Sequence, residues 1–183
     1  MQTTVIGNFN IIPDALPAEG NISIVIQPID IITHWRRCGL LADFIAGFYN
    51  NAAQQPDNIN LISTVMNELL ENATKYSRKR DALVALTLKQ YDNVLKMQLQ
   101  NYTTPNHFYY FKNYLASLLE QDNLEQLYIE KIVQKSDQKV TESGMGMLIL
   151  LKDYPVKIGA TFIEDPHTDH YEIITQLYYY FDN

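Results

Sequence analysis

The chain has 183 residues, of which 46% are hydrophobic and 19% are charged, a composition typical of one globular domain rather than a disordered chain. The net charge of −7 argues against general nucleic-acid binding, which requires a concentrated positive surface. A nucleotide remains compatible with this charge, because backbone N–H groups and one lysine are enough to hold a phosphate.

Three features predict a cytoplasmic protein. The single cysteine, Cys38, has no partner for an internal disulfide, which favours a reducing compartment. The first residues, MQTTVIGNFN, lack the basic start and apolar run of a signal peptide. No stretch approaches the roughly 18–20 apolar residues of a membrane span. We therefore expect no contact with membranes.

The first part of the chain is expected to hold a strand and two helices. Residues 1–20 contain two prolines and little periodicity, which predicts a tail or an irregular strap ahead of a single domain over residues 21–183. The β-branched segment 22–29 predicts a strand. A helix is expected over residues 31–52 and a second over residues 59–80. In the first of these, apolar residues recur at helical spacing: Leu40, Leu41, Phe44, Ile45 and Phe48.

The remaining elements predict paired strands with helices between them. Segments 82–89 and 94–102 read as strands, and Asp92 and Asn93 suit the turn of a hairpin. A mostly helical stretch over 104–135, a loop over 134–143 and a short helix over 144–154 follow, with last strands at 157–164 and 170–181. This order predicts an α+β (α/β) two-layer sandwich, with a mixed, mainly antiparallel sheet covered by helices on one face.

The helix that contains NELLENATKYS (67–77) presents a row of polar residues. Glu68, Asn72, Lys75 and Lys79 fall within roughly 60° of one another, beside the expected core face. That face holds Ile62, Val65, Leu69, Ala73 and Tyr76. An ordinary solvated face is one interpretation. However, asparagine is a poor residue in mid-helix, and a carboxylate, an amide and an ammonium suit a metal–triphosphate.

A second motif, SGMGM (143–147), opens the short apolar helix. Ser143 suits the N-cap, and the small Gly144 and Gly146 let a backbone approach an anion, which exposed N–H groups and the helix dipole then hold. The alternative is a loop whose glycines only ease a turn.

Together these segments resemble the GHKL (Bergerat-fold) ATPase superfamily, with a layout similar to compact bacterial SiaB-like regulatory kinases and anti-sigma-factor serine kinases. NELLENATKYS resembles the N-box, and SGMGMLILLKDY resembles the G2 box. The resemblance implies ATP and Mg²⁺ as cofactors, with Asn72 as the metal ligand, Lys75 near the phosphates and Glu68 as a general base. It also places four residues at the phosphates: Ser143, Gly144, Met145 and Gly146.

The sequence departs from this family where the G1 box, Asp-x-Gly-x-Gly, is expected. That place reads QNYTTPNHF, and Asn101 stands where the aspartate binds the adenine amino group. No glycine occurs between Gly47 and Gly144. An asparagine accepts the same hydrogen bond but supplies no charge.

Two functions follow from this pattern. The first is an ATP/Mg-dependent serine/threonine protein kinase that acts on a partner protein in a signalling switch. The second is a non-catalytic adaptor that binds a protein partner, with the aromatic segment 106–115 either filling the nucleotide site or forming an interface. Ordinary core packing is the alternative interpretation of these aromatic residues. A homodimer is compatible with both. A metal site in EDPHTDH, with Asp165, His167, Asp169 and His170, is a weaker alternative to a simple polar turn.

Overall fold

The computed structural model describes residues 1–53, 56–78, 82–137 and 145–181. Within these residues one sheet has the strand order β1-β5-β6-β4-β3-β2, and every neighbouring pair is antiparallel. Its six strands are β1 (Gln2–Gly7), β2 (Gly20–Ile26), β3 (Val84–Tyr91), β4 (Val94–Tyr102), β5 (Val156–Asp165) and β6 (His170–Tyr180). The helices are α1 (Pro28–Ile32), α2 (Arg36–Ala53), α3 (Pro56–Lys75), α4 (Pro105–Leu119), α5 (Leu124–Asp137) and α6 (Met145–Asp153).

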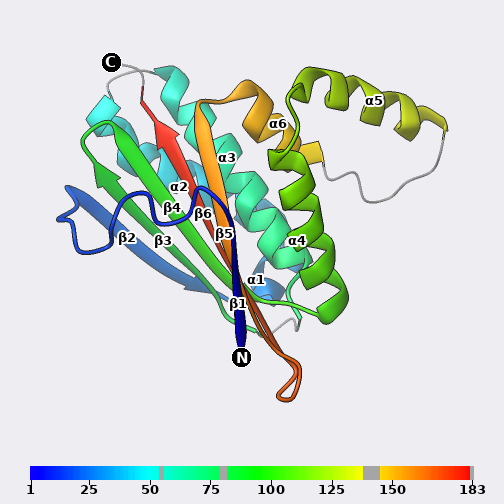
Figure 1. Cartoon of the computed structure of the whole chain (residues 1–183). Helices are drawn as coiled ribbons and strands as arrows, with labels where there is room; N and C mark the ends of the chain where they lie inside the picture. The colour runs from blue at the N-terminus through cyan, green and yellow to red at the C-terminus, as the bar shows by residue number, and fades with distance from the viewer. Residues whose placement is uncertain (54–55, 79–81, 138–144, 182–183) are drawn as a thin grey trace.

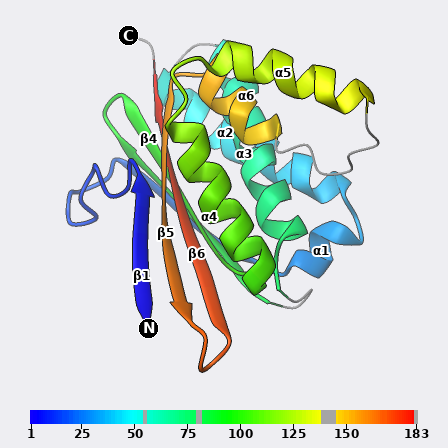
Figure 2. The ribbon, with the colours of Figure 1, turned by 45° about the vertical axis from the view of Figure 1, so that its right-hand side comes forward.

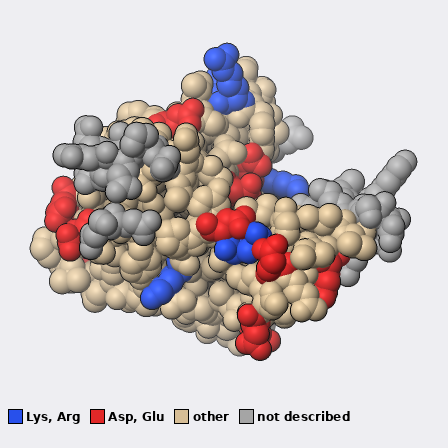
Figure 3. Space-filling view, turned by 90° about the horizontal axis from the view of Figure 1, so that it is seen from above, with Lys and Arg blue, Asp and Glu red and all other residues tan. Residues whose placement is uncertain are grey.

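The helices lie on one face of the sheet, so the predicted α+β two-layer sandwich is confirmed (Figure 1). The core between the layers is filled from both sides, by residues such as Ile62 and Leu70 of α3 and Leu88 and Leu99 of the sheet. None of the described helices combines the length and the apolar composition that a membrane crossing requires. On the face seen in Figure 3, basic side chains are interspersed with acidic and uncharged ones and form no continuous positive surface among the described residues.

The hairpin of β3 and β4 agrees closely with the sequence. The strand predicted over residues 94–102 is β4, and Asp92 in the turn has a φ of 46°, which a short polar side chain tolerates. Helix α3 begins at Pro56. It ends at Lys75, which is five residues before the predicted end at residue 80. It ends there because Ser77 bridges to Thr103 and the Arg78 N–H donates to the carbonyl of Tyr102, so the chain joins the end of β4 instead of continuing the helix.

The helix predicted over residues 31–52 is in fact two helices, α1 and α2, which are separated by residues 33–35. The predicted apolar stripe is also only partly buried: Leu40, Phe44 and Phe48 are exposed. Helix α2 buries a different set, namely Cys38, Ala42, Ile45, Ala46 and Tyr49. The small side chains of this set allow α3 to approach closely, and this packing decides which side of the helix faces inward.

The chain after α4 differs from the prediction at one point. Residues 134–137 belong to α5 rather than to a loop, and the rest of the predicted loop, residues 138–143, lies outside the described residues. Helix α5 projects from the body of the molecule (Figure 1). It is joined to α6 by an ion pair of 3.0 Å between Lys152 Nζ and Glu125 Oε2.

The N-terminal residues form a strand where an irregular tail or strap was predicted, and this prediction is wrong for residues 2–7. They form β1 at the edge of the sheet, where Thr4 pairs with Phe162 of β5 (Figure 2). Residues 8–19, which we call the strap, then cross the face of the sheet that the helices leave open and reach β2 at the opposite edge. Gly7, with a φ of +71°, makes the turn from β1 into the strap.

Candidate functional site

A cavity of about 310 Å³ lies between α3, α4, the start of α6 and the central strands β4 and β6. Its volume is at the lower limit of common small-molecule sites. Polar groups line it from α3 and from the sheet, and aromatic rings line it from α4. The residues of interest are Glu68, Glu71, Asn72, Lys75, Tyr76, Leu99, Asn101, Thr103, His107, Tyr110, Phe111, Tyr114, Met145, Gly146, Ile173 and Thr175.

Helix α3 supplies the row of polar residues that the sequence singled out. Ile62, Val65, Leu69 and Ala73 are buried, which confirms the predicted core face. Because Glu68, Asn72 and Lys75 stand just beside this buried stripe, all three line the cavity. Glu68 and Asn72 are half-buried, and Lys75 is exposed. Tyr76, which was expected in the core, is half-buried and also lines the cavity.

The carboxylate of Glu68 lies directly against the backbone of Gly146 in the first turn of α6. A Cβ added at residue 146 would overlap the carboxylate and approach its Cδ to 2.6 Å. Burial raises the pKa of Glu68 above its ordinary value, and the neighbouring charge of Glu71 raises it further. A carboxylate with a raised pKa beside a helix N-terminus is suited to accepting a proton from a bound hydroxyl.

Replacement of Gly146 by alanine is expected to disturb the site more than the fold. The atoms in the way belong to the flexible Glu68 side chain, so the carboxylate moves and the backbone stays. Alanine is also favoured over glycine inside a helix by about 1 kcal/mol. We expect the free energy of unfolding to stay within about 1 kcal/mol of wild type in urea titrations. The matched control is Gly47→Ala, at an exposed helical glycine with open space at its Cβ position.

Strands β4 and β6 form the floor of the cavity. Asn101 is only 6% exposed, and its side-chain amide makes no hydrogen bond to another described residue. Thr175 of β6 lies on the same floor, with the apolar Leu99 and Ile173 beside it. The amide of Asn101 is not among the fully buried side-chain groups that lack a partner, so the cavity leaves it accessible for a hydrogen bond to a ligand.

Helix α4 forms the aromatic wall. Thr104 caps it by accepting a hydrogen bond from the His107 N–H, and His107 packs edge-on against Tyr76 with ring centroids 5.0 Å apart. Tyr110 and Tyr114 are stacked, with an angle of 6° between their planes. The sequence offered two roles for the aromatic segment 106–115, and the structure places part of it on the cavity wall.

The structure therefore brings together six of the predicted site residues: Glu68, Asn72, Lys75, Asn101, Met145 and Gly146. Ser143 and Gly144 lie outside the described residues. Sequence reasoning missed Glu71, Thr103 and Thr175. Glu71 could have been found because it stands between Glu68 and Asn72 in the sequence. Nothing in the local sequence distinguishes the two threonines from ordinary strand residues.

The segment EDPHTDH does not gather its acids and histidines. Asp165 accepts a hydrogen bond from the His167 N–H, which is the arrangement of a polar turn. Asp169 pairs with Arg78, and His170 Nε2 lies 3.2 Å from Glu172 Oε2. The described residues contain no group of three or more metal-ligating side chains, here or elsewhere.

No protein-family model matches the chain, and no curated protein matches it either.

Proposed function

We propose that this protein is a nucleotide-binding regulatory protein with a histidine-kinase-like ATPase fold, which uses Mg-ATP to phosphorylate a serine or threonine of a partner protein. The observation that supports this most is the convergence of Glu68, Asn72 and Lys75 on one cavity with Gly146, which is about seventy residues away in sequence. The three α3 side chains span about 10 Å along the helix, at a rise of 1.5 Å per residue. That length suits a chain of phosphates.

Each group has a chemical role in this proposal. The Asn72 amide oxygen is a hard ligand of the kind that Mg²⁺ prefers, and Lys75 supplies positive charge for phosphate. Bound Mg²⁺ would neutralise charge on the phosphates. Glu68 accepts the proton of the attacking hydroxyl while the new P–O bond forms and ADP leaves with the old bridging oxygen. The absence of a side chain at Gly146 leaves room for the Glu68 carboxylate, so the general base is held at the start of α6.

The sheet floor and the aromatic wall fit the base. Asn101 presents a neutral amide that accepts a hydrogen bond from an amino group, and the rings of α4 offer flat apolar surfaces. The unpartnered amide of Asn101 supports this placement, since a bound purine would satisfy it.

Isothermal titration calorimetry with ATP tests the proposal. We expect binding that requires Mg²⁺ and weakens at least tenfold in Asn72→Ala, because the substitution removes a metal ligand. The matched control is Asn67→Ala on the same helix, because Asn67 does not itself line the cavity and its amide donates to Glu71 Oε1. Equal weakening by both substitutions would contradict a metal-binding role for Asn72.

A non-catalytic adaptor is the second candidate, and two observations favour it. The G1-box glycines are missing from the sequence, and Tyr110, Phe111 and Tyr114 occupy part of the space around the cavity. In this case ATP at about millimolar concentration would produce neither heat nor a thermal shift in the folded wild-type protein. That result would reject the kinase.

A further inference from the structure

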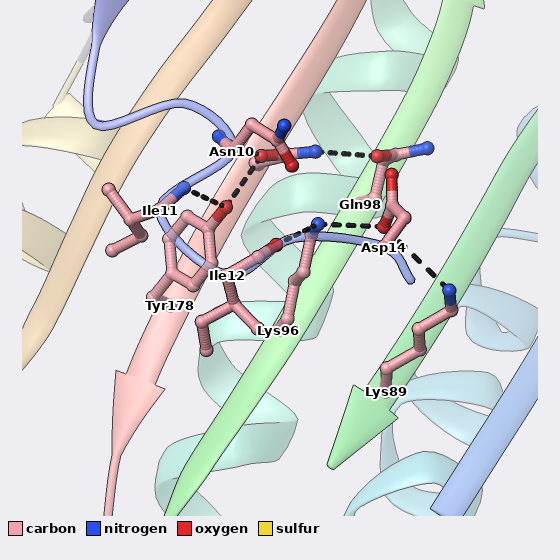
Figure 4. A network of polar contacts seen from close by, with 9 residues as sticks. Asn10, Ile11, Ile12, Asp14, Lys89, Lys96, Gln98 and Tyr178 are labelled. Atoms are coloured by element: carbon pink, nitrogen blue, oxygen red, sulfur yellow. Dashed lines mark hydrogen bonds and ion pairs between the residues drawn. The ribbon is translucent and has the colours of Figure 1, made fainter. Parts of the chain in front are cut away.

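The strap is held on the open face of the sheet through its backbone. The Asn10 N–H donates to Gln176 Oε1 at 2.7 Å, and the Ile11 N–H donates to the Tyr178 hydroxyl at 3.1 Å. Lys96 Nζ donates to the Ile12 carbonyl at 3.0 Å (Figure 4). Three successive residues of the strap are thus recognised by side chains of two different strands.

One strap side chain, Asp14, is also recognised. Its Oδ1 lies 2.8 Å from Lys96 Nζ and 3.7 Å from Lys89 Nζ (Figure 4). Lys96 is only 2% exposed, so its ammonium depends on the strap for partners. The hydrogen bond from Lys96 lowers the pKa of Asp14, so the carboxylate is charged at neutral pH.

The sheet residues that contact the strap are also hydrogen-bonded to one another and to their neighbours in the sheet. The Gln176 Nε2 donates to Gln98 Oε1 at 2.7 Å, and the Tyr178 hydroxyl donates to Gln176 Oε1 at 2.6 Å. Lys96, Gln176 and Tyr178 are all buried by the cover that the strap provides. If the strap served only to exclude water, the side chains of the sheet beneath it would be apolar, because apolar side chains have no polar groups that need hydrogen bonds.

The strap's own side chains add little to this contact. Ile11 is 43% exposed and Leu16 is 51% exposed, so the apolar residues of the strap are largely outside the core. Segments with few buried apolar contacts open at low free-energy cost compared with the core. The surface therefore recognises the bent backbone of residues 10–12, in which Asn10 has a φ of 55°, and the carboxylate of Asp14 in the turn that follows.

We propose that this face of the sheet is a peptide-recognition surface, and that the strap covers it as an internal, replaceable ligand. The partner that fits is a segment of another protein that adopts the same bent backbone and carries a carboxylate, which would bind to Lys96 and Lys89 after the strap lifts. The charge of the two lysines and the three backbone contacts define this chemistry. Because the strap is tethered, its effective concentration is high, and a free peptide competes poorly with it.

Gly159→Ala provides a protein with the strap displaced. A Cβ at residue 159 would approach the Asn8 carbonyl oxygen and the Phe9 nitrogen to 2.6 Å, and these backbone atoms move only with the strap itself. The probe is a fluorescent peptide of residues 8–15, NFNIIPDA, and its binding is followed by anisotropy. We expect the variant to bind it at least tenfold more tightly than wild type does. Two changes are each expected to weaken peptide binding by the Gly159→Ala protein at least tenfold. The first is Lys96→Met in the protein, and the second is asparagine in place of Asp14 in the peptide.

Three results would overturn the proposal. The first is a folded Gly159→Ala protein that does not bind the peptide at about millimolar concentration, and the second is unchanged binding by the Lys96→Met variant. The third is a dimer of the variant that exchanges straps without binding peptide, which would assign the surface to a second copy.

Hydrogen exchange of the wild-type protein decides the matter if Gly159→Ala does not fold. The amides of Asn10 and Ile11 are expected to exchange at least a hundredfold faster than those of β6, because the strap opens without the sheet. If the amides of the strap and those of β6 exchange only through global unfolding, the strap is not replaceable.

Discussion

Glu68→Gln is expected to lower the rate of ADP release from Mg-ATP by about 10²–10⁴-fold, which is the usual contribution of a positioned general base. Glutamine keeps the shape of the side chain but accepts no proton from the attacking serine or water. Affinity for Mg-ATP should stay within about threefold of wild type, because the metal and phosphate contacts are assigned to other residues. A coupled assay of ADP release and calorimetry measure the two quantities. Unchanged turnover would remove Glu68 from the mechanism.

The same substitution has a pH-dependent effect on stability, and its sign follows from the raised pKa of Glu68. A carboxyl group whose pKa is raised in the folded state binds its proton more tightly there than in the unfolded chain. Its contribution to stability is therefore greatest at low pH and is lost as the pH rises through the folded-state pKa. Glu68→Gln removes that loss, so the variant should melt at a higher temperature than wild type at neutral pH.

Thermal melts across the acidic range check this expectation. The difference in melting temperature should shrink as the pH falls below the ordinary pKa of a glutamate, near 4.5. Glu71→Gln is expected to give a smaller change of the same sign, since the charge of Glu71 contributes to the raised pKa of Glu68. A variant less stable than wild type at neutral pH would contradict the proposed cost of burying the Glu68 charge.

Phe108→Ala is expected to lower the free energy of unfolding by about 3–5 kcal/mol, the range for truncating a fully buried phenylalanine. Phe108 is 0% exposed, and its ring packs edge-on against those of Phe162 and Tyr171, with centroids 5.5 and 5.3 Å away. These contacts hold α4 against β5 and β6. The aromatic wall of the cavity is therefore expected to loosen, and Mg-ATP affinity should fall together with stability.

Urea titration measures the first effect and calorimetry the second. The matched control is Phe44→Ala on α2, where the ring is 59% exposed and truncation should change stability by less than about 1 kcal/mol. A loss of stability in Phe108→Ala no larger than in this control would show that α4 is not anchored through Phe108.

Patterns that repeat within one element were readable from the sequence. The alternation of the apolar Leu95, Met97 and Leu99 with polar residues predicted β4, because a strand turns successive side chains to opposite faces. The helical spacing of α3 predicted both its buried stripe and the polar row beside it. For α2 the same reasoning chose the wrong stripe, since two apolar faces were available and packing against α3 decided between them.

By itself, the sequence determined that Glu68, Asn72 and Lys75 share one edge of a helix, because helical geometry is local and fixed by spacing. Only the tertiary structure decided that this edge meets Gly146, Asn101 and the rings of α4 around a cavity. The same is true of the strap and of β1, whose partners in other elements lie more than 70 residues away in sequence. Contacts at such separations depend on how whole elements pack and on which strands become neighbours, and no local pattern of residues specifies these.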